Sequence, residues 1–332
     1  MMEMRVFGRT GMHVSVLGFG CGAVGGLMTR GEPADQERAV ARAIEYGINY
    51  FDTAAQYGDG ASERNLGRVL KTLRADVIVG TKVRVMPQER SDIGKAITAG
   101  LEASLQRLGR DSVDLFQLHN LISDDGDDKT LSANMVLNEV VPALERLRKQ
   151  GKTRFIGITA LGDTQSLHRV VDAGVFDTAQ VAYNVLNPSA GAALPPHYPA
   201  HDYDKLLERT QAADMGTINI RVLAGGALSG VEARHPLGSP AVEPIGSGRD
   251  YAMDAKRARQ LEPLVKEGHA DSLIEAGLRF VIANKGVSTV LVGYSTFEHF
   301  EYAAKAMQKG PLKGPALKRL AELQAGFAGD AR

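Results

Sequence analysis

Short apolar runs rich in β-forming residues alternate along the chain with longer segments in which apolar residues recur at helical spacing. This alternation is typical of repeated βα units that build a parallel sheet. We expect eight apolar runs to be strands, at residues 14–18, 48–51, 77–80, 113–118, 155–158, 178–181, 217–220 and 289–292. The helical spacing predicts helices between them, at residues 35–46, 62–73, 91–108, 137–149, 164–173 and 273–283.

Glycines stand directly after the expected helices. A left-handed cap at the end of a helix favours glycine, and six glycines occupy such positions: Gly47, Gly109, Gly151, Gly174, Gly216 and Gly286. Eight consecutive βα units fit a (β/α)₈ TIM barrel, and barrels with insertions exceed ~250 residues as one domain. We therefore predict an α/β protein with a single barrel domain over residues 1–332 and loop insertions near 121–134, 187–202 and 224–250.

The charges of the chain balance, with 39 lysines and arginines against 39 aspartates and glutamates. Without an excess of positive charge, neither nucleic acid nor an anionic membrane is expected as a partner. Cys21 is the only cysteine, which excludes a disulfide framework and a cysteine-based zinc cluster and fits a reducing compartment. The charged N-terminal segment does not resemble a signal peptide, and no stretch approaches the ~20 apolar residues that cross a membrane. We expect a soluble, cytoplasmic protein.

Polar or small residues follow nearly every expected strand. These positions are Asp52, Lys82 after Thr81, His119, Thr159, Gln180, Arg221 and Gly293. In a TIM barrel the active site forms at the carboxyl ends of the strands, so residues far apart in the sequence converge on one mouth. Tyr57 lies five residues after Asp52, ahead of a helix that Ser62 opens. The pattern predicts that these side chains share one site.

Four of these residues form a set suited to the reduction of a carbonyl group by hydride. The alkoxide that develops must receive a proton, and Tyr57 is a candidate general acid. A lysine ammonium close to the phenol, here Lys82, favours the phenolate and makes the phenol a stronger acid, and Asp52 would keep that lysine charged and oriented. His119 can hydrogen-bond the substrate oxygen as charge develops on it. Each residue alone is more often structural, but their joint placement favours a catalytic site.

Four runs resemble successive signatures of the aldo-keto reductase superfamily, in order and over nearly the whole chain: YFDTAAQYGDGASERNLG, VGTKV, DSVDLFQLHN and VSTVLVGYS. The resemblance implies a catalytic tetrad of Tyr57, Asp52, Lys82 and His119. It also implies a nicotinamide cofactor extended across the barrel mouth and an oxidoreductase that reduces aldehydes or ketones to alcohols. We expect a small-molecule carbonyl substrate and no metal site.

The same resemblance assigns cofactor-binding positions residue by residue. They are Gly22, Ala23, Asp52, Thr159, Gln180, Ile220, Arg221, Leu223, Gly293, Ser295, Thr296 and His299. Gln180 corresponds to the family's nicotinamide-binding glutamine, and Thr159 with Ala160 replaces the usual Ser-Asn pair beside it. Ile220 and Arg221 begin the segment where the family often has an aromatic residue followed by Ser-Pro-Leu.

Ser295 stands where the family commonly has a lysine or arginine for the 2′-phosphate of NADP. A hydroxyl can hydrogen-bond a phosphate but supplies no charge. His299 is a candidate for part of that role, and Arg221 for the phosphates elsewhere. We expect NADP as the cofactor, with NAD as the alternative.

Two other functions are compatible with the same barrel. One is an NAD-dependent sugar (aldose) dehydrogenase working in the oxidising direction, which the uncharged Ser295 would permit. The other is a non-catalytic redox-sensing subunit that resembles the potassium-channel β subunits, although the intact tetrad favours an enzyme. The sequence leaves the physiological substrate, the direction of the reaction and the oligomeric state open.

A second dinucleotide-binding motif is weaker. Residues 20–25 match the G-x-G-x-x-G pattern of a Rossmann fold, but that motif must open a helix directly, and glycines and Pro33 follow here. Cys21 within it is expected to be a small buried residue. His197 and His201 have the spacing of a helical metal pair, but the surrounding prolines predict a loop.

Overall fold

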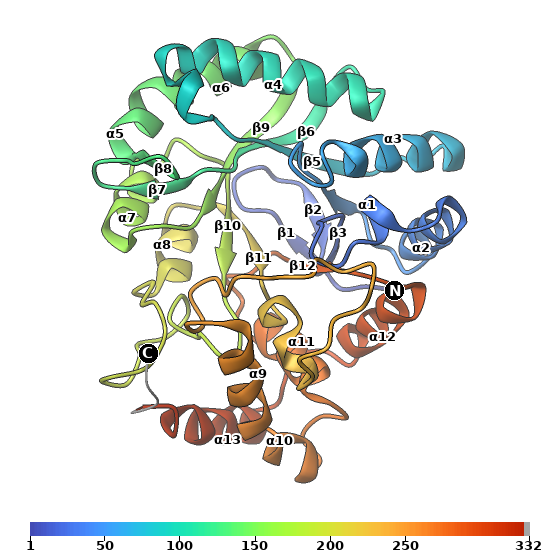
Figure 1. The fold of residues 1–332 in the computed structure, drawn as a ribbon, viewed down its shortest axis with the longest axis vertical. Helices are drawn as coiled ribbons and strands as arrows, with labels where there is room; N and C mark the ends of the chain where they lie inside the picture. The colour runs from blue at the N-terminus through green and yellow to red at the C-terminus, as the bar shows by residue number, and fades with distance from the viewer. Residues whose placement is uncertain (329–332) are drawn as a thin grey trace.

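The apolar runs form a closed barrel of eight parallel strands in the computed structural model, which describes residues 1–328 (Figure 1). In barrel order the strands are β3 (Leu17–Gly20), β4 (Tyr50–Asp52), β5 (Ile78–Val83), β6 (Val113–Leu118), β9 (Thr153–Ala160), β10 (Thr178–Ala182), β11 (Gly216–Ile220) and β12 (Thr289–Gly293). Pairing of β12 with β3 closes the barrel. The predicted fold class, a (β/α)₈ barrel, is confirmed.

A helix follows each barrel strand and packs on the outside of the barrel. These helices are α2 (Pro33–Glu45), α3 (Ala61–Leu73), α4 (Ile93–Leu108), α6 (Val141–Lys149), α7 (Thr164–Asp172), α8 (Leu206–Ala212), α11 (Leu273–Ala283) and α12 (Phe297–Gln308). Side chains of Asp92, Asp163, Ser272 and Thr296 cap four of them by accepting backbone N–H bonds.

Further elements lie between these units and after the last of them. They are α1 (Leu27–Arg30), the 3₁₀ turn η1 (Pro87–Asp92), α5 (Ala133–Met135), the π-helical turn η2 (Val136–Val140), the 3₁₀ turn η3 (Ala224–Ser229), α9 (Tyr251–Gln260), α10 (Pro263–Lys266) and α13 (Gly314–Ala325). None of the helices within residues 1–328 is long and apolar enough to cross a membrane.

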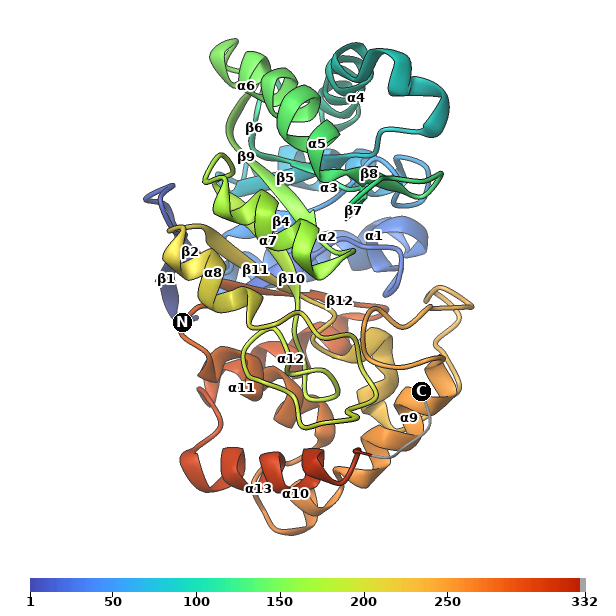
Figure 2. The ribbon, with the colours of Figure 1, turned by 90° about the vertical axis from the view of Figure 1, so that its left-hand side faces the viewer.

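An antiparallel hairpin of β1 (Met4–Val6) and β2 (His13–Ser15) lies at one end of the barrel, at the left edge of Figure 2. The expected strand 14–18 is therefore wrong at its start, because Val14 belongs to this hairpin and the barrel strand begins at Leu17. Phe7, which follows β1, packs on the ring of Tyr50 inside the barrel, with ring centroids 5.7 Å apart. The hairpin thus covers the amino ends of the strands.

Four of the six glycines expected to cap helices do so with positive φ, namely Gly47, Gly109, Gly151 and Gly174. The expectation for Gly216 is wrong, since Gly216 begins β11 and the left-handed residue before it is Asp214. A Cβ on Gly216 would collide with the ring of Phe7, so glycine is needed there for close approach of the hairpin. Gly286 has no positive φ either.

The three expected loop insertions lie at the other end of the barrel. The first contains a short strand pair, β7 (Leu121–Ser123) and β8 (Thr130–Ser132), which the hydrophobic pattern did not indicate. The second, 187–202, has no helix or strand. We call the third, residues 224–250, the strap segment; it appears at the right of Figure 2, opposite the hairpin. These segments surround the carboxyl ends of the strands, where the polar residues gather.

Candidate active site

Three of the expected catalytic side chains form one connected chain at the mouth of the barrel. Asp52 ends β4, and Lys82 lies on the adjacent strand β5. Lys82 Nζ makes an ion pair with Asp52 Oδ1 and donates to the carbonyl of Thr53 (2.8 Å) and the hydroxyl of Tyr57 (3.3 Å). Lys82 is completely buried and Asp52 is 2% exposed. Water therefore does not compete with this pair.

The loop that carries Tyr57 is held by its own backbone and by small polar side chains. The Tyr57 N–H donates to the carbonyl of Ala54 (3.1 Å), and the Ser62 N–H donates to the carbonyl of Tyr57 (3.2 Å). The Ser62 hydroxyl bonds that of Thr53 (2.8 Å) and donates to the carbonyl of Cys21 (2.9 Å). Cys21 is buried, as expected. These contacts place the phenol of Tyr57 over Lys82.

The ionisable groups around Tyr57 have well-defined charge states. Burial opposes the charge of Lys82, but the Asp52 carboxylate and Tyr57 outweigh it, so the pKa of Lys82 is raised above its usual value. Burial, then the positive charges of Lys82 and Arg84, hold the pKa of His119 well below its usual value. At neutral pH the site therefore presents a lysine cation and a neutral imidazole.

His119 follows β6 and faces the ring of Tyr57 edge-on, with ring centroids 5.8 Å apart and an interplanar angle of 86°. Its Nδ1 lies 3.2 Å from Gln56 Oε1. The ring nitrogen that carries the hydrogen is set by the orientation of the Gln56 amide. As the Gln56 amide stands, its Oε1 accepts from Nδ1–H; with the amide flipped, the hydrogen would lie on His119 Nε2, the nitrogen that a substrate oxygen beside Tyr57 would meet.

Asp52 is more extensively bonded than the sequence indicated. Its Oδ2 accepts hydrogen bonds from the hydroxyl of Tyr50 (2.9 Å), from Gln180 Nε2 (2.9 Å) and from Gln117 Nε2 (3.2 Å). Sequence reasoning missed Tyr50 and Gln117. Each lies two residues before a residue that the pattern singled out, and residues two apart on a strand face the same side. That spacing could have identified both.

Gln180 connects Asp52 to Thr159 on the neighbouring strand. The Thr159 hydroxyl donates to Gln180 Oε1 over 3.5 Å, at the limit of a hydrogen bond, while Gln180 Nε2 donates to Asp52. Gln180 Oε1 thus keeps most of its accepting capacity for a ligand amide. Both side chains are buried, 3% and 2% exposed, with Thr159 near the carboxyl end of β9 and Gln180 in the middle of β10.

The segment after β3 lies beside Tyr57. A Cβ on Gly22 would lie 3.8 Å from the Tyr57 ring, in ordinary van der Waals contact with the phenol. The strap segment is fastened to this segment, because Ser239 donates to the carbonyls of Val24 (3.1 Å) and Ala23 (2.9 Å). Arg30 donates from Nε to the carbonyl of Leu237 (2.8 Å). The strap segment therefore spans the mouth between β11 and β3.

Arg221 directly follows β11 and adopts a left-handed backbone with φ of 60°. Its carbonyl accepts a bond from Asn184 Nδ2 (2.9 Å), which stabilises this conformation. Its guanidinium has no hydrogen-bond or ion-pair partner within residues 1–328. Burial lowers its pKa, and among the charges near it Tyr57 is the strongest influence, acting in the opposite direction. An unpaired cation thus lies in the mouth near Tyr57.

The remaining expected cofactor residues lie around the ends of β11 and β12. Ile220 ends β11 and Leu223 precedes η3, both half-buried. Gly293 ends β12 against the segment of Gly25. Ser295 is buried and donates to the carbonyl of Gly25 (2.6 Å).

Thr296 and His299 open the helix that follows. The Thr296 hydroxyl accepts the His299 N–H (3.2 Å) as the cap of α12, and the exposed His299 ring faces His235 of the strap segment, with ring centroids 5.8 Å apart.

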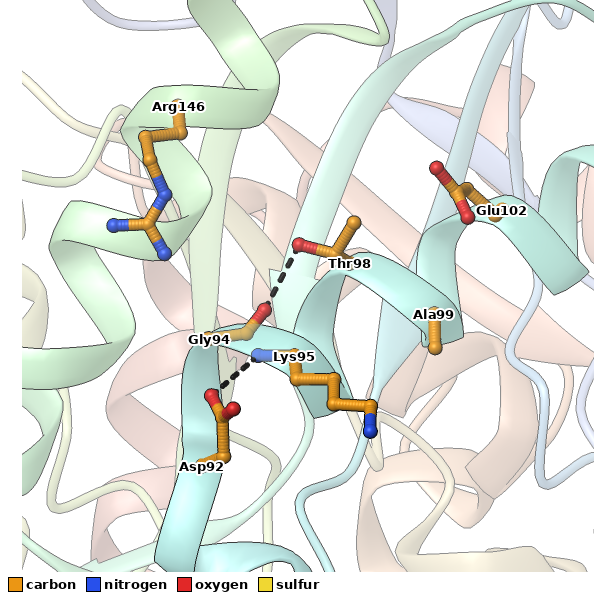
Figure 3. A pocket seen from close by; sticks show the side chains of 7 residues that line it. All are labelled: Asp92, Gly94, Lys95, Thr98, Ala99, Glu102 and Arg146. Atoms are coloured by element: carbon orange, nitrogen blue, oxygen red, sulfur yellow. Dashed lines mark hydrogen bonds between the residues drawn. The ribbon is translucent and has the colours of Figure 1, made fainter.

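A separate hollow on the outer wall of the barrel, between α4 and α6, is lined by Asp92, Lys95, Glu102 and Arg146 (Figure 3). Thr98 there donates to the carbonyl of Gly94, and Asp92 accepts from the Lys95 N–H as the cap of α4.

Comparison with known proteins agrees with this arrangement. The model of the aldo/keto reductase family matches residues 16–325. The chain therefore belongs to the aldo/keto reductase family, and the predicted class of enzyme, an oxidoreductase of this family, is confirmed.

Relatives with named activities cover much of the chain. L-Galactose dehydrogenase of Arabidopsis thaliana is 29% identical over 98% of this chain and 94% of its own length. D-threo-Aldose 1-dehydrogenase of a Pseudomonas species is 32% identical over 56% of this chain and 62% of its own length. L-Glyceraldehyde 3-phosphate reductase of Escherichia coli K12 is 25% identical over 92% of this chain and 88% of its own.

Solved structures share the fold. An aldo-keto reductase from Bacillus halodurans in its holo form superposes with a TM-score of 0.73 at 24% identity, over 97% of this chain and 96% of that one. An aldo/keto reductase from Klebsiella pneumoniae, in complex with NADP and acetate, gives a TM-score of 0.68 at 23% identity, over 98% and 96%.

Proposed function

We propose that this chain is an NADP(H)-dependent reductase that converts aldehydes or ketones to alcohols with Tyr57 as the proton donor. The buried connection from Asp52 through Lys82 to the hydroxyl of Tyr57 is the observation that carries the proposal. A charged lysine beside a phenol stabilises the phenolate that remains after proton transfer. The complex of the Klebsiella pneumoniae enzyme with NADP supports the choice of cofactor.

The residues at the mouth fit a nicotinamide dinucleotide. When bound, this cofactor supplies the hydride. Gly22, which has no side chain beside the Tyr57 ring, and the adjacent Ala23 would contact the nicotinamide end, and Gln180 Oε1 would accept a carboxamide N–H, with Asp52 and Thr159 beside it. The unpaired Arg221 suits a diphosphate. The remaining residues of the proposed cofactor site are Ile220, Leu223, Gly293, Ser295, Thr296 and His299.

Each tetrad residue then has a separate task. Tyr57 gives its hydroxyl proton to the carbonyl oxygen as hydride reaches the carbonyl carbon, so that an alcohol forms. Lys82 stabilises the phenolate of Tyr57, and Asp52 holds Lys82 in place. Neutral His119, with the Gln56 amide flipped and the ring hydrogen on Nε2, donates a hydrogen bond to the same oxygen, which stabilises the charge that develops on it. In the reverse direction the phenolate accepts the proton.

Oxidation of a sugar is the second candidate. L-Galactose dehydrogenase and D-threo-aldose 1-dehydrogenase are both named for the oxidation of sugars. The buried Ser295 supplies no positive charge to a 2′-phosphate, which favours use of NAD in that direction. Both candidates use the same tetrad and differ in cofactor and substrate.

The experiment that tests the proposal is a fluorescence titration with NADPH and NADH, followed by turnover assays. The reduction of 4-nitrobenzaldehyde by NADPH is compared with the oxidation of L-galactose by NAD⁺. We expect tighter binding of NADPH and measurable reduction. Sugar oxidation with NAD⁺ alone would establish the second candidate, binding without turnover would favour a sensing subunit, and absence of binding would contradict the proposal.

Tyr57→Phe is the decisive variant because it removes the proton and keeps the ring. We expect reduction to fall by roughly 10²-fold or more, with the Kd for NADPH unchanged within about threefold. Tyr46→Phe is a matched control, because Tyr46 also donates to a carboxylate, Glu301 (3.1 Å), but on the outside of the barrel. Wild-type turnover in Tyr57→Phe would refute the assigned role.

A further inference from the structure

Two buried polar side chains lie directly beneath the tetrad and have no part in the mechanism above. The hydroxyl of Tyr50 and Nε2 of Gln117 both donate to Asp52 Oδ2, over 2.9 and 3.2 Å. Both residues are completely buried. Neither can touch a substrate in the mouth, so any effect on the reaction must pass through Asp52.

The ring of Tyr50 fills a slot that two glycines leave open on the axis of the barrel. A Cβ on Gly80 would lie 2.7 Å from the Tyr50 hydroxyl oxygen, and a Cβ on Gly18 would lie 3.1 Å from the ring. Phe7 packs on the same ring from the hairpin side. These contacts fix the position of the Tyr50 hydroxyl, which lies within hydrogen-bond distance of Asp52 Oδ2.

The buried amide of Gln117 is only partly hydrogen-bonded, which lowers the stability of the fold. Its Oε1 is buried with no hydrogen-bond partner within residues 1–328. Burial of an unpaired carbonyl oxygen is unfavourable, and an apolar side chain of the same length would avoid it. The contact that the amide does make is the bond from Nε2 to Asp52 Oδ2. That bond is therefore the feature that accounts for an amide at this position.

We propose that Tyr50 and Gln117 are positioning residues that set the strength of the Lys82–Tyr57 interaction through Asp52. Hydrogen bonds to Oδ2 draw negative charge away from Oδ1, the oxygen that pairs with Lys82. More of the positive electrostatic potential of Lys82 then acts on the hydroxyl of Tyr57, 3.3 Å away. Loss of a donor to Oδ2 returns charge to Oδ1, neutralises Lys82 more fully and leaves Tyr57 a weaker acid. The inference rests on the proposed role of Tyr57.

Tyr50 is suited to this role and not to proton donation. Burial, followed by the negative charge of Asp52, raises the pKa of Tyr50 well above its usual value. The hydroxyl therefore stays protonated and keeps donating to Asp52 throughout the pH range in which the enzyme would work. Tyr57, partly exposed at the mouth, is the tyrosine that a substrate can reach.

Tyr50→Phe tests the inference, with the single-turnover rate of NADPH oxidation measured against pH on the preformed complex with 4-nitrobenzaldehyde. Reduction needs protonated Tyr57, so the rate falls as pH rises through a midpoint. We expect the maximum rate to fall about tenfold and the midpoint to rise by about half a pH unit, since one hydrogen bond to a charged group changes. The Kd for NADPH should stay within about twofold. Tyr46→Phe, the matched control, should change neither quantity.

An unchanged midpoint in Tyr50→Phe would overturn the inference even if the rate fell, because a packing defect lowers the rate without moving the midpoint. Gln117→Met removes the second donor and the unpaired oxygen together and decides the matter if Tyr50→Phe does not fold. Its midpoint should also rise, and no rise would overturn the inference. Tyr57→Phe in the same assay separates the two proposals: if it keeps turnover, the role of Tyr57 fails first.

Discussion

Replacement of Lys82 by methionine separates what the buried ion pair does for stability from what it does for catalysis. Methionine fills the volume of the aliphatic stem but leaves the Asp52 carboxylate, 2% exposed, without a counter-charge. Removal of one partner of a buried pair costs ~3–5 kcal/mol. The three donors on Asp52 Oδ2 remain, so the lower figure applies.

The expected shift in melting temperature follows from the size of the chain. An unfolding entropy of ~2.1 cal/mol/K per residue gives roughly 0.7 kcal/mol/K for the whole chain. A loss of about 3 kcal/mol therefore lowers Tm by roughly 4 °C in Lys82→Met. Addition of Asp52→Asn removes the unpaired charge, and its oxygen can still accept from Tyr50, so about half of the loss should return.

Activity should not return with stability. We expect Lys82→Met to reduce NADPH-dependent turnover at least ~10²-fold, and the double variant to stay equally inactive because no cation remains beside Tyr57. Differential scanning fluorimetry and steady-state turnover on the two single variants and the double variant give the full cycle. Strictly additive losses in Tm would show that Lys82 and Asp52 are not coupled, and wild-type turnover in Lys82→Met would refute the mechanism.

Two further substitutions are expected to raise stability. Arg221→Met should raise Tm slightly, because it removes a partly buried cation that has no partner. The same substitution should weaken NADPH binding about tenfold, as loss of a charged hydrogen bond implies. An unchanged Kd in fluorescence titration would mean that Arg221 does not bind the cofactor. Asp254 of α9 is fully buried, with Oδ1 unpaired, and burial raises its pKa to about 6. Because this folded-state pKa exceeds the ordinary 3.8, folding is favoured when the carboxyl is protonated and that advantage is lost as pH rises through about 6. Asp254→Asn should therefore stabilise the protein by up to about 3 kcal/mol at pH ~7.5 and by roughly half as much near pH ~5, and a gain independent of pH in denaturant titrations would contradict this origin.

The parts of the fold that depend on local pattern were predictable from the sequence. The eight barrel strands occur within a few residues of the expected runs, because buried parallel strands are continuously apolar. The hairpin of β1 and β2 was not predicted, since its two strands have three residues each and are partly exposed. The capping role expected for Gly216 was wrong because a distant residue, Phe7, determines why glycine is required there.

The sequence alone was sufficient to predict the barrel and the four residues proposed as the tetrad. The succession of strands along the chain and the position of a residue at a strand end can be read from the local sequence. Closure of the barrel then brings these strand ends together at one mouth. Only the tertiary structure shows that Asp52 receives three donors on one oxygen, that Tyr50 stands in a slot beside Gly18 and Gly80, and that Ser295 bonds Gly25. Apart from the bond from Tyr50 to Asp52 within β4, these contacts join segments that lie apart in the chain, and which atoms meet depends on the register and tilt of the closed barrel. The period of two along a strand indicates that Tyr50 and Gln117 face the same side as the site residues, but it does not encode which atoms meet.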